Sequence, residues 1–258
     1  MMTPPRPRNP RDTQPRRLEW TPELVARFWS SVWTTRLKEF SFARQGGRSL
    51  IVALEHLWPP GTSVLDFGAG VGDLTDLLLD RDVRVAAYDP SEEARTVLAG
   101  RFAGRSGFIG AIGPDTDHQF DVVILAEVIE HVLEAEFELT LGRVAQYVRP
   151  GGMVVVTTPN NEDLELGMCV DPLNNVMFHR WQHLRSFNRQ SICTTLARFG
   201  FAEVVTHEIE LSDHYFVPYD SRWGNGGELP GHLLATRGNQ PCRLGGQQNL
   251  VYVGQKLE

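Results

Sequence analysis

Short apolar runs alternate along the chain with segments in which apolar residues recur every three or four positions. An uninterrupted apolar run is typical of a strand buried on both faces, and the wider spacing is typical of a helix that buries one face. The runs predict strands over residues 63–67, 83–88, 121–125, 153–158, 202–211 and 249–255. The spaced segments predict helices within 21–58 and over 73–79, 92–101, 134–148 and 189–199. This alternation predicts an α/β fold, doubly wound, with a mostly parallel sheet and helices on both faces.

The ends of the chain differ from its middle. Residues 1–17 hold five prolines and five arginines, a composition typical of a disordered basic arm. Residues 212–247 are rich in glycine and irregular, which is typical of an insert or lid. We therefore predict an arm (1–17) followed by one domain (18–258), which comprises N-terminal helices (18–58), a cofactor-binding core (59–211), the insert (212–247) and a last strand (248–258).

Composition and charge narrow the classes of function. The formal charge is −7; the arm contributes +4 from five arginines and one aspartate, so the rest of the chain carries −11. An acidic body argues against nucleic-acid binding that depends on neutralising phosphates. No apolar run approaches the ~18 residues of a membrane helix, no secretory leader is apparent, and three cysteines are too few for a disulfide framework. We expect a cytoplasmic protein without a membrane partner.

A glycine-rich turn follows the first predicted strand. Gly68, Gly70 and Gly72 stand between this strand and the next helix, where glycine lets the backbone turn tightly and approach a ligand. The dinucleotide fingerprint G-x-G-x-x-G would place its third glycine at position 73, but that residue is Asp73. The turn therefore indicates a ligand other than a dinucleotide.

Two carboxylates flank this turn. Asp66 lies near the end of the strand before it, and Asp89 closes the next strand. A carboxylate repels a diphosphate, whereas it attracts a ligand that carries an ammonium and a sulfonium group in a partly dry cleft. Asp89 can also accept hydrogen bonds from both hydroxyls of a ribose. Together the two carboxylates predict a positively charged nucleoside ligand.

Four motifs follow one another along the chain, namely Asp66-x-Gly68-x-Gly70-x-Gly72, Asp89, Asp121–Val128 and Arg149–Gly152. In this order and spacing they resemble the class I S-adenosylmethionine-dependent methyltransferases over roughly residues 45–210. The resemblance implies a seven-stranded sheet with an antiparallel last strand, and S-adenosylmethionine as the cofactor. The residues that it implies for cofactor binding are Asp66, Gly68, Ala69, Gly70, Asp89, Pro90, Ile112 and Glu127.

The acceptor side is predicted from a cluster of carboxylates and histidines. Glu127, Glu130 and His131 follow the predicted strand 121–125 with the spacing of one helical face, and His183 comes later. This pattern resembles the small-RNA 3′-terminal ribose 2′-O-methyltransferases, which implies a Mg²⁺, Mn²⁺ or Fe²⁺ site formed by these four residues. The same pattern is similar to metal-free methyltransferases, including the ubiquinone-pathway O-methyltransferases, in which Glu130 and His131 pack the segment or His131 acts as a base.

A second segment, Phe178–Phe187, is similar to bacterial methyltransferases of cell-surface or glycan pathways. Those proteins carry C-P-x-C just before it, but this chain has Asp171-Pro172-Leu173-Asn174, which lacks both thiolates and excludes a zinc knuckle there. Cys169, which precedes that position, is expected to be a small buried residue.

These patterns predict methyl transfer from S-adenosylmethionine to a hydroxyl oxygen of a small-molecule or glycan-type acceptor, with His131, His183 and Glu130 as catalytic residues. Two alternatives stay open: a metal-dependent RNA ribose 2′-O-methyltransferase, and an inactive scaffold that binds the cofactor. The sequence does not fix the oligomeric state.

Overall fold

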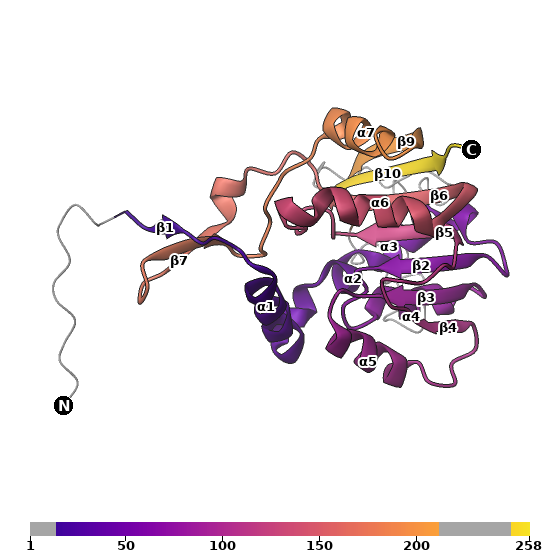
Figure 1. Ribbon diagram of the computed structural model, residues 1–258, viewed down its shortest axis with the longest axis horizontal. Helices are drawn as coiled ribbons and strands as arrows, with labels where there is room; N and C mark the ends of the chain where they lie inside the picture. Colours follow the sequence, from indigo (N-terminus) through magenta and orange to yellow (C-terminus); the bar gives the residue numbers. More distant parts are fainter. Residues whose placement is uncertain (1–13, 212–248) are drawn as a thin grey trace, which may run out of the picture.

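A seven-stranded sheet forms the centre of the computed structural model, which describes residues 14–211 and 249–258 (Figure 1). Its strand order is β4-β3-β2-β5-β6-β10-β9. Strand β10 runs antiparallel to both of its neighbours, and the other neighbouring pairs are parallel. The strands are β2 (Ser63–Phe67), β3 (Arg84–Tyr88), β4 (Phe108–Ala111), β5 (Phe120–Ala126), β6 (Val148–Pro159), β9 (Phe201–Ile209) and β10 (Asn249–Lys256). The predicted fold class is confirmed.

Helices cover both faces of the sheet because successive strand residues point to opposite sides. Val64 of β2 packs in one core with α3, α4 and α5, whereas its neighbour Leu65 packs in the other with α6 and α7. The helices are α1 (Pro22–Thr34), α2 (Phe42–Gln45), α3 (Gly47–Ala53), α4 (Asp73–Leu79), α5 (Glu92–Arg101), α6 (Phe137–Tyr147) and α7 (Arg189–Ala197). Short 3₁₀ turns lie at Arg36–Phe40, Glu55–Leu57, Glu134–Glu136 and Leu164–Gly167. The core is therefore a three-layer α/β sandwich.

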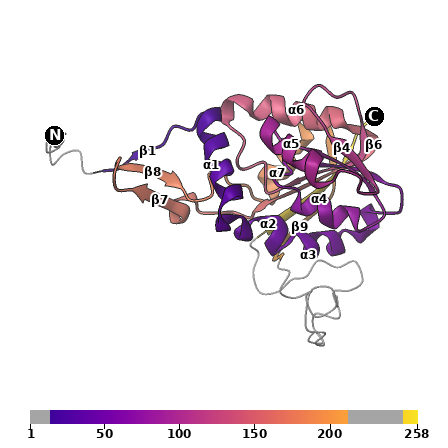
Figure 2. The same ribbon diagram turned by 90° about the horizontal axis from the view of Figure 1, so that it is seen from below.

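A small second sheet projects beyond α1, at the edge where the parallel strands of the main sheet end (Figures 1 and 2). It has the order β1-β8-β7, from β1 (Arg16–Arg17), β8 (Val176–His179) and β7 (Met168–Asp171). The predicted disordered arm thus extends too far, because Arg16 and Arg17 pair in parallel with β8. The prediction for Cys169 is also wrong, since this residue is exposed on β7.

Some predictions fall outside the described residues. They are the remainder of the arm, residues 1–13, and the insert at 212–247. Within the described parts of the chain, no helix has the length and apolar character needed to cross a membrane.

The centre of the main sheet should dominate stability. Ile124 of β5 is 0% exposed, so Ile124→Ala should lower the free energy of unfolding by about 2–5 kcal/mol through lost burial and a residual cavity. The matched control is Val97→Ala on α5, where Val97 is 51% exposed and the change should stay within about 0.5 kcal/mol. Urea denaturation of both variants checks this. Equal losses in the two variants would contradict the assigned core.

Candidate active site

The glycine turn lies between β2 and α4 and is tied to the end of β3. The amides of Gly68 and Ala69 donate to the Tyr88 carbonyl at 2.8 and 2.9 Å. The next amide, of Gly70, donates to Asp89 Oδ2 at 3.1 Å. Gly70 has a φ of 54°, and a Cβ there would meet the Trp33 ring at 2.6 Å, so both conformation and space require glycine. The turn is thus fixed against Asp89.

Asp66 is buried beside this turn, and Asp89 is partly buried there. Asp66 is 2% exposed and its Oδ2 accepts from the Thr75 hydroxyl at 2.6 Å. Asp89 Oδ1 accepts from the Ser91 amide at 2.9 Å. Burial raises the pKa of each carboxyl to about 6, because the charged form loses its hydration. A positively charged ligand here would restore a favourable environment for both carboxylates.

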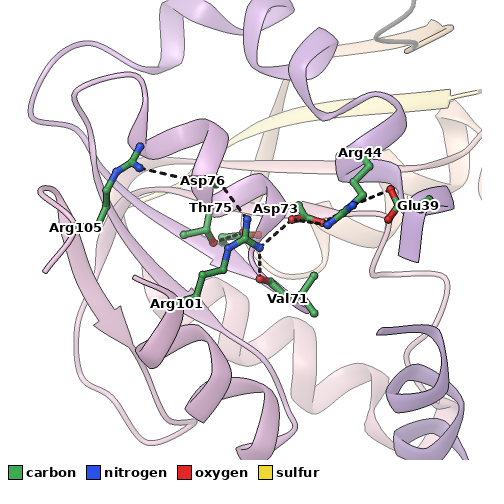
Figure 3. A network of polar contacts seen from close by, with 9 residues as sticks. Glu39, Arg44, Val71, Asp73, Thr75, Asp76, Arg101 and Arg105 are labelled. Carbon is green, nitrogen blue, oxygen red and sulfur yellow. Dashed lines mark hydrogen bonds and ion pairs between the residues drawn. The ribbon is translucent and has the colours of Figure 1, made fainter. Parts of the chain in front are cut away.

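Asp73, the residue that departs from the dinucleotide fingerprint, lies in an ion-pair network outside the turn (Figure 3). It contacts Arg44 at 2.6 Å and Arg101 at 2.9 Å, and Arg101 also donates to the Val71 carbonyl at 2.5 Å. Burial acts to raise the pKa of Asp73, but the hydrogen bonds from the two arginines outweigh it and lower the pKa. The network holds the turn from its outer side and links it to α2 and α5.

The carboxyl ends of four adjacent strands carry the residues predicted for the cofactor. Gly68 follows β2, and Asp89 and Pro90 follow β3. Ile112 follows β4, where its amide donates to the Ala87 carbonyl at 2.9 Å, and Glu127 follows β5. Because neighbouring parallel strands end at one edge, these residues share that edge.

Glu127, Glu130 and His131 do not share a helical face as the spacing suggested. Glu127 takes a left-handed φ of 54°, and residues 127–133 form turns rather than a helix. The Glu127 amide donates to the Thr157 carbonyl at 3.0 Å, and the His131 amide to that of Val128 at 3.0 Å. A turn at the end of β5 therefore gathers these side chains.

Glu130 is buried, Glu127 and His131 are partly buried, and each of the three has covered polar atoms without a partner among the described residues. Within the described part of the chain, both oxygens of Glu130, Oε1 of Glu127 and Nδ1 of His131 are buried without a hydrogen-bond partner. Burial, reinforced by the neighbouring Glu127, raises the pKa of Glu130 well above its usual value, and burial raises that of Glu127 as well. Burial lowers the pKa of His131, with the nearby His183 adding to the effect. Such unpaired buried groups indicate a missing ligand, proton or ion.

His183 joins this cluster from the loop after β8. One ligand atom each of Glu130, His131 and His183 lies within 4.8 Å of the others, whereas Glu127 stands outside this group. A second group, formed by Glu162, His179 and the same His183, meets the same distance. The sequence analysis missed His179 and Glu162 as site residues, although His179 stands only four positions before His183.

Helix α1 packs over this edge. Trp33 lies against Gly70, and Trp29 stacks on Trp33 with 5.4 Å between ring centroids. The Trp29 and His131 rings are steeply inclined to each other, with 4.8 Å between their centroids. Trp29 Nε1 also donates to Gln182 Oε1 at 2.9 Å. One helix therefore contacts both the glycine turn and the histidine cluster.

Comparison with known proteins identifies the family. A family model described as a methyltransferase domain matches residues 31–207. The ubiquinone biosynthesis O-methyltransferase of Rhizobium leguminosarum bv. trifolii is 32% identical over 197 residues, covering 70% of this chain and 73% of the relative. The corresponding protein of Rhizobium rhizogenes is 34% identical over 176 residues, covering 63% and 67%.

Solved structures share the fold. A Burkholderia thailandensis 1,6-didemethyltoxoflavin-N1-methyltransferase with bound S-adenosylhomocysteine gives a TM-score of 0.58 at 18% identity, covering 95% of this chain and 94% of that one. An S-adenosylmethionine-dependent methyltransferase from Clostridium acetobutylicum gives 0.57 at 11% identity, covering 90% and 99%. The family model, the Rhizobium relatives and the shared fold together show that the chain belongs to the class I S-adenosylmethionine-dependent methyltransferases.

Proposed function

We propose that this enzyme methylates a hydroxyl oxygen of a small-molecule acceptor, with a glycan-type acceptor within the same class. The observation that carries the proposal is the buried cluster of Glu130, His131 and His183 at the edge that also holds the glycine turn. A hydroxyl must lose its proton as it is methylated, so an oxygen acceptor requires a base or a cation nearby. The names of the Rhizobium relatives, which are O-methyltransferases, support the same chemistry.

The proposed cofactor residues bind different parts of one ligand. S-adenosylmethionine supplies an activated methyl group on a positively charged sulfur. We propose that Asp66, Gly68, Ala69 and Gly70 bind its methionine part, and that Asp89 and Pro90 bind its ribose. Ile112 would lie against the adenine, and Glu127 would border the cofactor where the acceptor site begins. The raised pKa values of Asp66 and Asp89 support this, because a cation favours their ionised forms.

On the acceptor side, His131 and His183 are the proposed proton acceptors. The pKa of His131 is lowered by burial, so its imidazole is neutral and carries a lone pair. Glu130 is fully buried beside it, and burial together with the neighbouring Glu127 raises its pKa well above the usual value, which favours its protonated form. The close contact of Trp29 with His131 keeps this imidazole in place.

The same side chains fit a divalent cation, and this fit supports a metal-dependent variant of the function as the second candidate. Carboxylate oxygen and imidazole nitrogen suit Mg²⁺, Mn²⁺ or Fe²⁺. Glu130 and His131 offer buried atoms without partners in the described residues, and His183 lies within reach. We propose Glu130, His131 and His183 as the ligands, with Glu127 as a neighbouring charge rather than a fourth ligand. Bound there, the ion would lower the cost of removing the acceptor proton.

Two alternative functions can be distinguished from this proposal by experiment. A ribose 2′-O-methyltransferase would methylate RNA and bind it less tightly as salt rises. A scaffold would bind the cofactor without transferring methyl to any acceptor.

Cofactor binding tests the first part of the proposal. Asp89→Asn should weaken S-adenosylhomocysteine binding at least tenfold in calorimetry, because an isosteric amide loses the charge-assisted hydrogen bonds to the ribose. The exposed Asp117→Asn is the matched control and should bind like the unmodified chain. Undiminished binding by Asp89→Asn would remove the assigned ribose site.

The raised pKa values predict a pH dependence of cofactor affinity. The ligand favours ionised Asp66 and Asp89, whose pKa values are about 6 without it. Affinity for S-adenosylmethionine should be greatest above about pH 7 and fall on acidification through pH 6, by about tenfold per pH unit for each carboxyl that must lose a proton. Calorimetry between about pH 5 and 8 in buffers of different ionisation heat checks this. A constant affinity without proton release would contradict the proposed pairing.

Mn²⁺ binding tests the cation. The unmodified chain should bind one Mn²⁺, measured by electron paramagnetic resonance of the free ion, and Glu130→Gln or His131→Gln should abolish binding. The exposed His118→Gln serves as the control. If the unmodified chain leaves Mn²⁺ free and methyl transfer survives EDTA, the cation is excluded and His131 acts as a base.

A further inference from the structure

His183 is shared by two groups of potential ligands, and its hydrogen bonds decide which group it serves. One group adds Glu130 and His131 to it, and the other adds Glu162 and His179. A neutral imidazole has a lone pair on only one ring nitrogen, while the other carries a proton. The partners of each ring nitrogen therefore indicate where the lone pair points.

His179 presents a proton rather than a lone pair to this cluster. Its Nδ1 accepts hydrogen bonds from the backbone amides of Trp181 at 3.3 Å and His183 at 3.2 Å. An accepting Nδ1 leaves the ring proton on Nε2. That Nε2 lies 3.4 Å from Glu162 Oε1. The protonated nitrogen of His179 is therefore the one close to Glu162, at an ion-pair distance without a hydrogen bond, and His179 lacks the free lone pair that a cation ligand needs.

His183 has the opposite arrangement. Its Nδ1 lies 2.5 Å from Glu162 Oε2, and a carboxylate accepts hydrogen bonds. In the neutral form of the ring, the proton is thus on Nδ1 and the lone pair is on Nε2. The His183 ring stacks on the His179 ring with 4.4 Å between centroids, and its centroid lies 4.9 Å from that of the His131 ring. Because Nδ1 is engaged with Glu162, Nε2 is the nitrogen left for Glu130 and His131.

The loop that carries His183 is fastened to the segment that carries Glu130 and His131. Gln182 is 0% exposed, and its Nε2 donates to the His131 carbonyl at 2.9 Å. On the other side of His183, the Leu184 amide donates to the Glu130 carbonyl at 2.9 Å. These two bonds flank His183 and fix the chain on both sides of it.

We propose that Glu162 is a positioning residue that fixes the tautomer of His183, with His179 orienting Glu162 in turn. The inference rests on the proposed function and adds the residues that prepare His183 for it. A carboxylate on the remote nitrogen of a working imidazole sets its tautomer and orientation, and it makes the other nitrogen a better electron donor. The pair formed by Glu162 and His179 is thus support for the site, not a second cation site.

Nitrogen-15 NMR of the histidine rings in the full chain tests this without relying on activity. His183, assigned by the signals that disappear in His183→Asn, should carry its proton on Nδ1, and His179 should carry its proton on Nε2. In Glu162→Ala the His183 signals should shift toward a mixture of tautomers. A proton on Nε2 of His183 in the unmodified chain would overturn the inference.

Mn²⁺ affinity and methyl transfer give the second readout. Glu162→Ala should weaken one or both by about 10–100-fold, and Glu162→Asp should restore part of the loss. Affinity for S-adenosylhomocysteine should stay unchanged, which shows that the variant is folded. The control is Glu165→Ala, an exposed carboxylate on the same segment that pairs with Arg17.

The two proposals fail in different ways. If Glu162→Ala left both the His183 tautomer and the Mn²⁺ affinity unchanged, the role of Glu162 would be refuted. Abolition of Mn²⁺ binding by His179→Gln with the His183 tautomer intact would refute it too, because that result would make His179 a ligand. A chain without cofactor binding or methyl transfer would refute the proposed function instead, while the NMR result would still decide the tautomer.

Discussion

The burial of carboxyl groups at one edge of the sheet is the constraint on which the site depends. Asp66, Asp89, Glu127 and Glu130 all lie at or just after the ends of parallel strands, and burial raises the pKa of each. Removing charge from water is costly unless an opposite charge or a proton compensates for it. Arg44 and Arg101, which lie near the glycine turn, pair with Asp73 instead. The edge is therefore suited to positively charged ligands, which would compensate for the carboxylates.

Contacts between distant parts of the chain give this edge its shape. Helix α1 reaches the glycine turn through Trp33, and it reaches the later loop through the hydrogen bond from Trp29 to Gln182. Gln182 also binds the backbone at His131. The cofactor side and the acceptor side are thus connected through one helix. A substitution at Trp29 would therefore affect both sides. Trp29 contacts the acceptor side directly through its indole nitrogen, and it reaches the glycine turn through its stacking on Trp33.

Much of the main sheet was predictable because its signals are local. Strand Ser63–Phe67 and helix Asp73–Leu79 have the expected bounds, since an uninterrupted apolar run and a glycine turn mark them. Strand Phe108–Ala111 was missed because it is short, partly exposed and interrupted by Gly110. The spacing of Glu127, Glu130 and His131 suggested a helix, but side chains three or four positions apart can also be brought together by a turn. Glu162 could not be ranked as a site residue, since its contact with His183 arises only in the folded chain.

The antiparallel course of β10 has a practical consequence for handling the protein. Every parallel strand delivers its last residue to the ligand-binding edge, but β10 runs the other way and ends at Lys256 on the far side (Figure 1). Arg16 and Arg17, by contrast, lie in the small sheet beside the histidine loop. An affinity handle or surface tether joined after Glu258 would keep the reactive edge facing open solution.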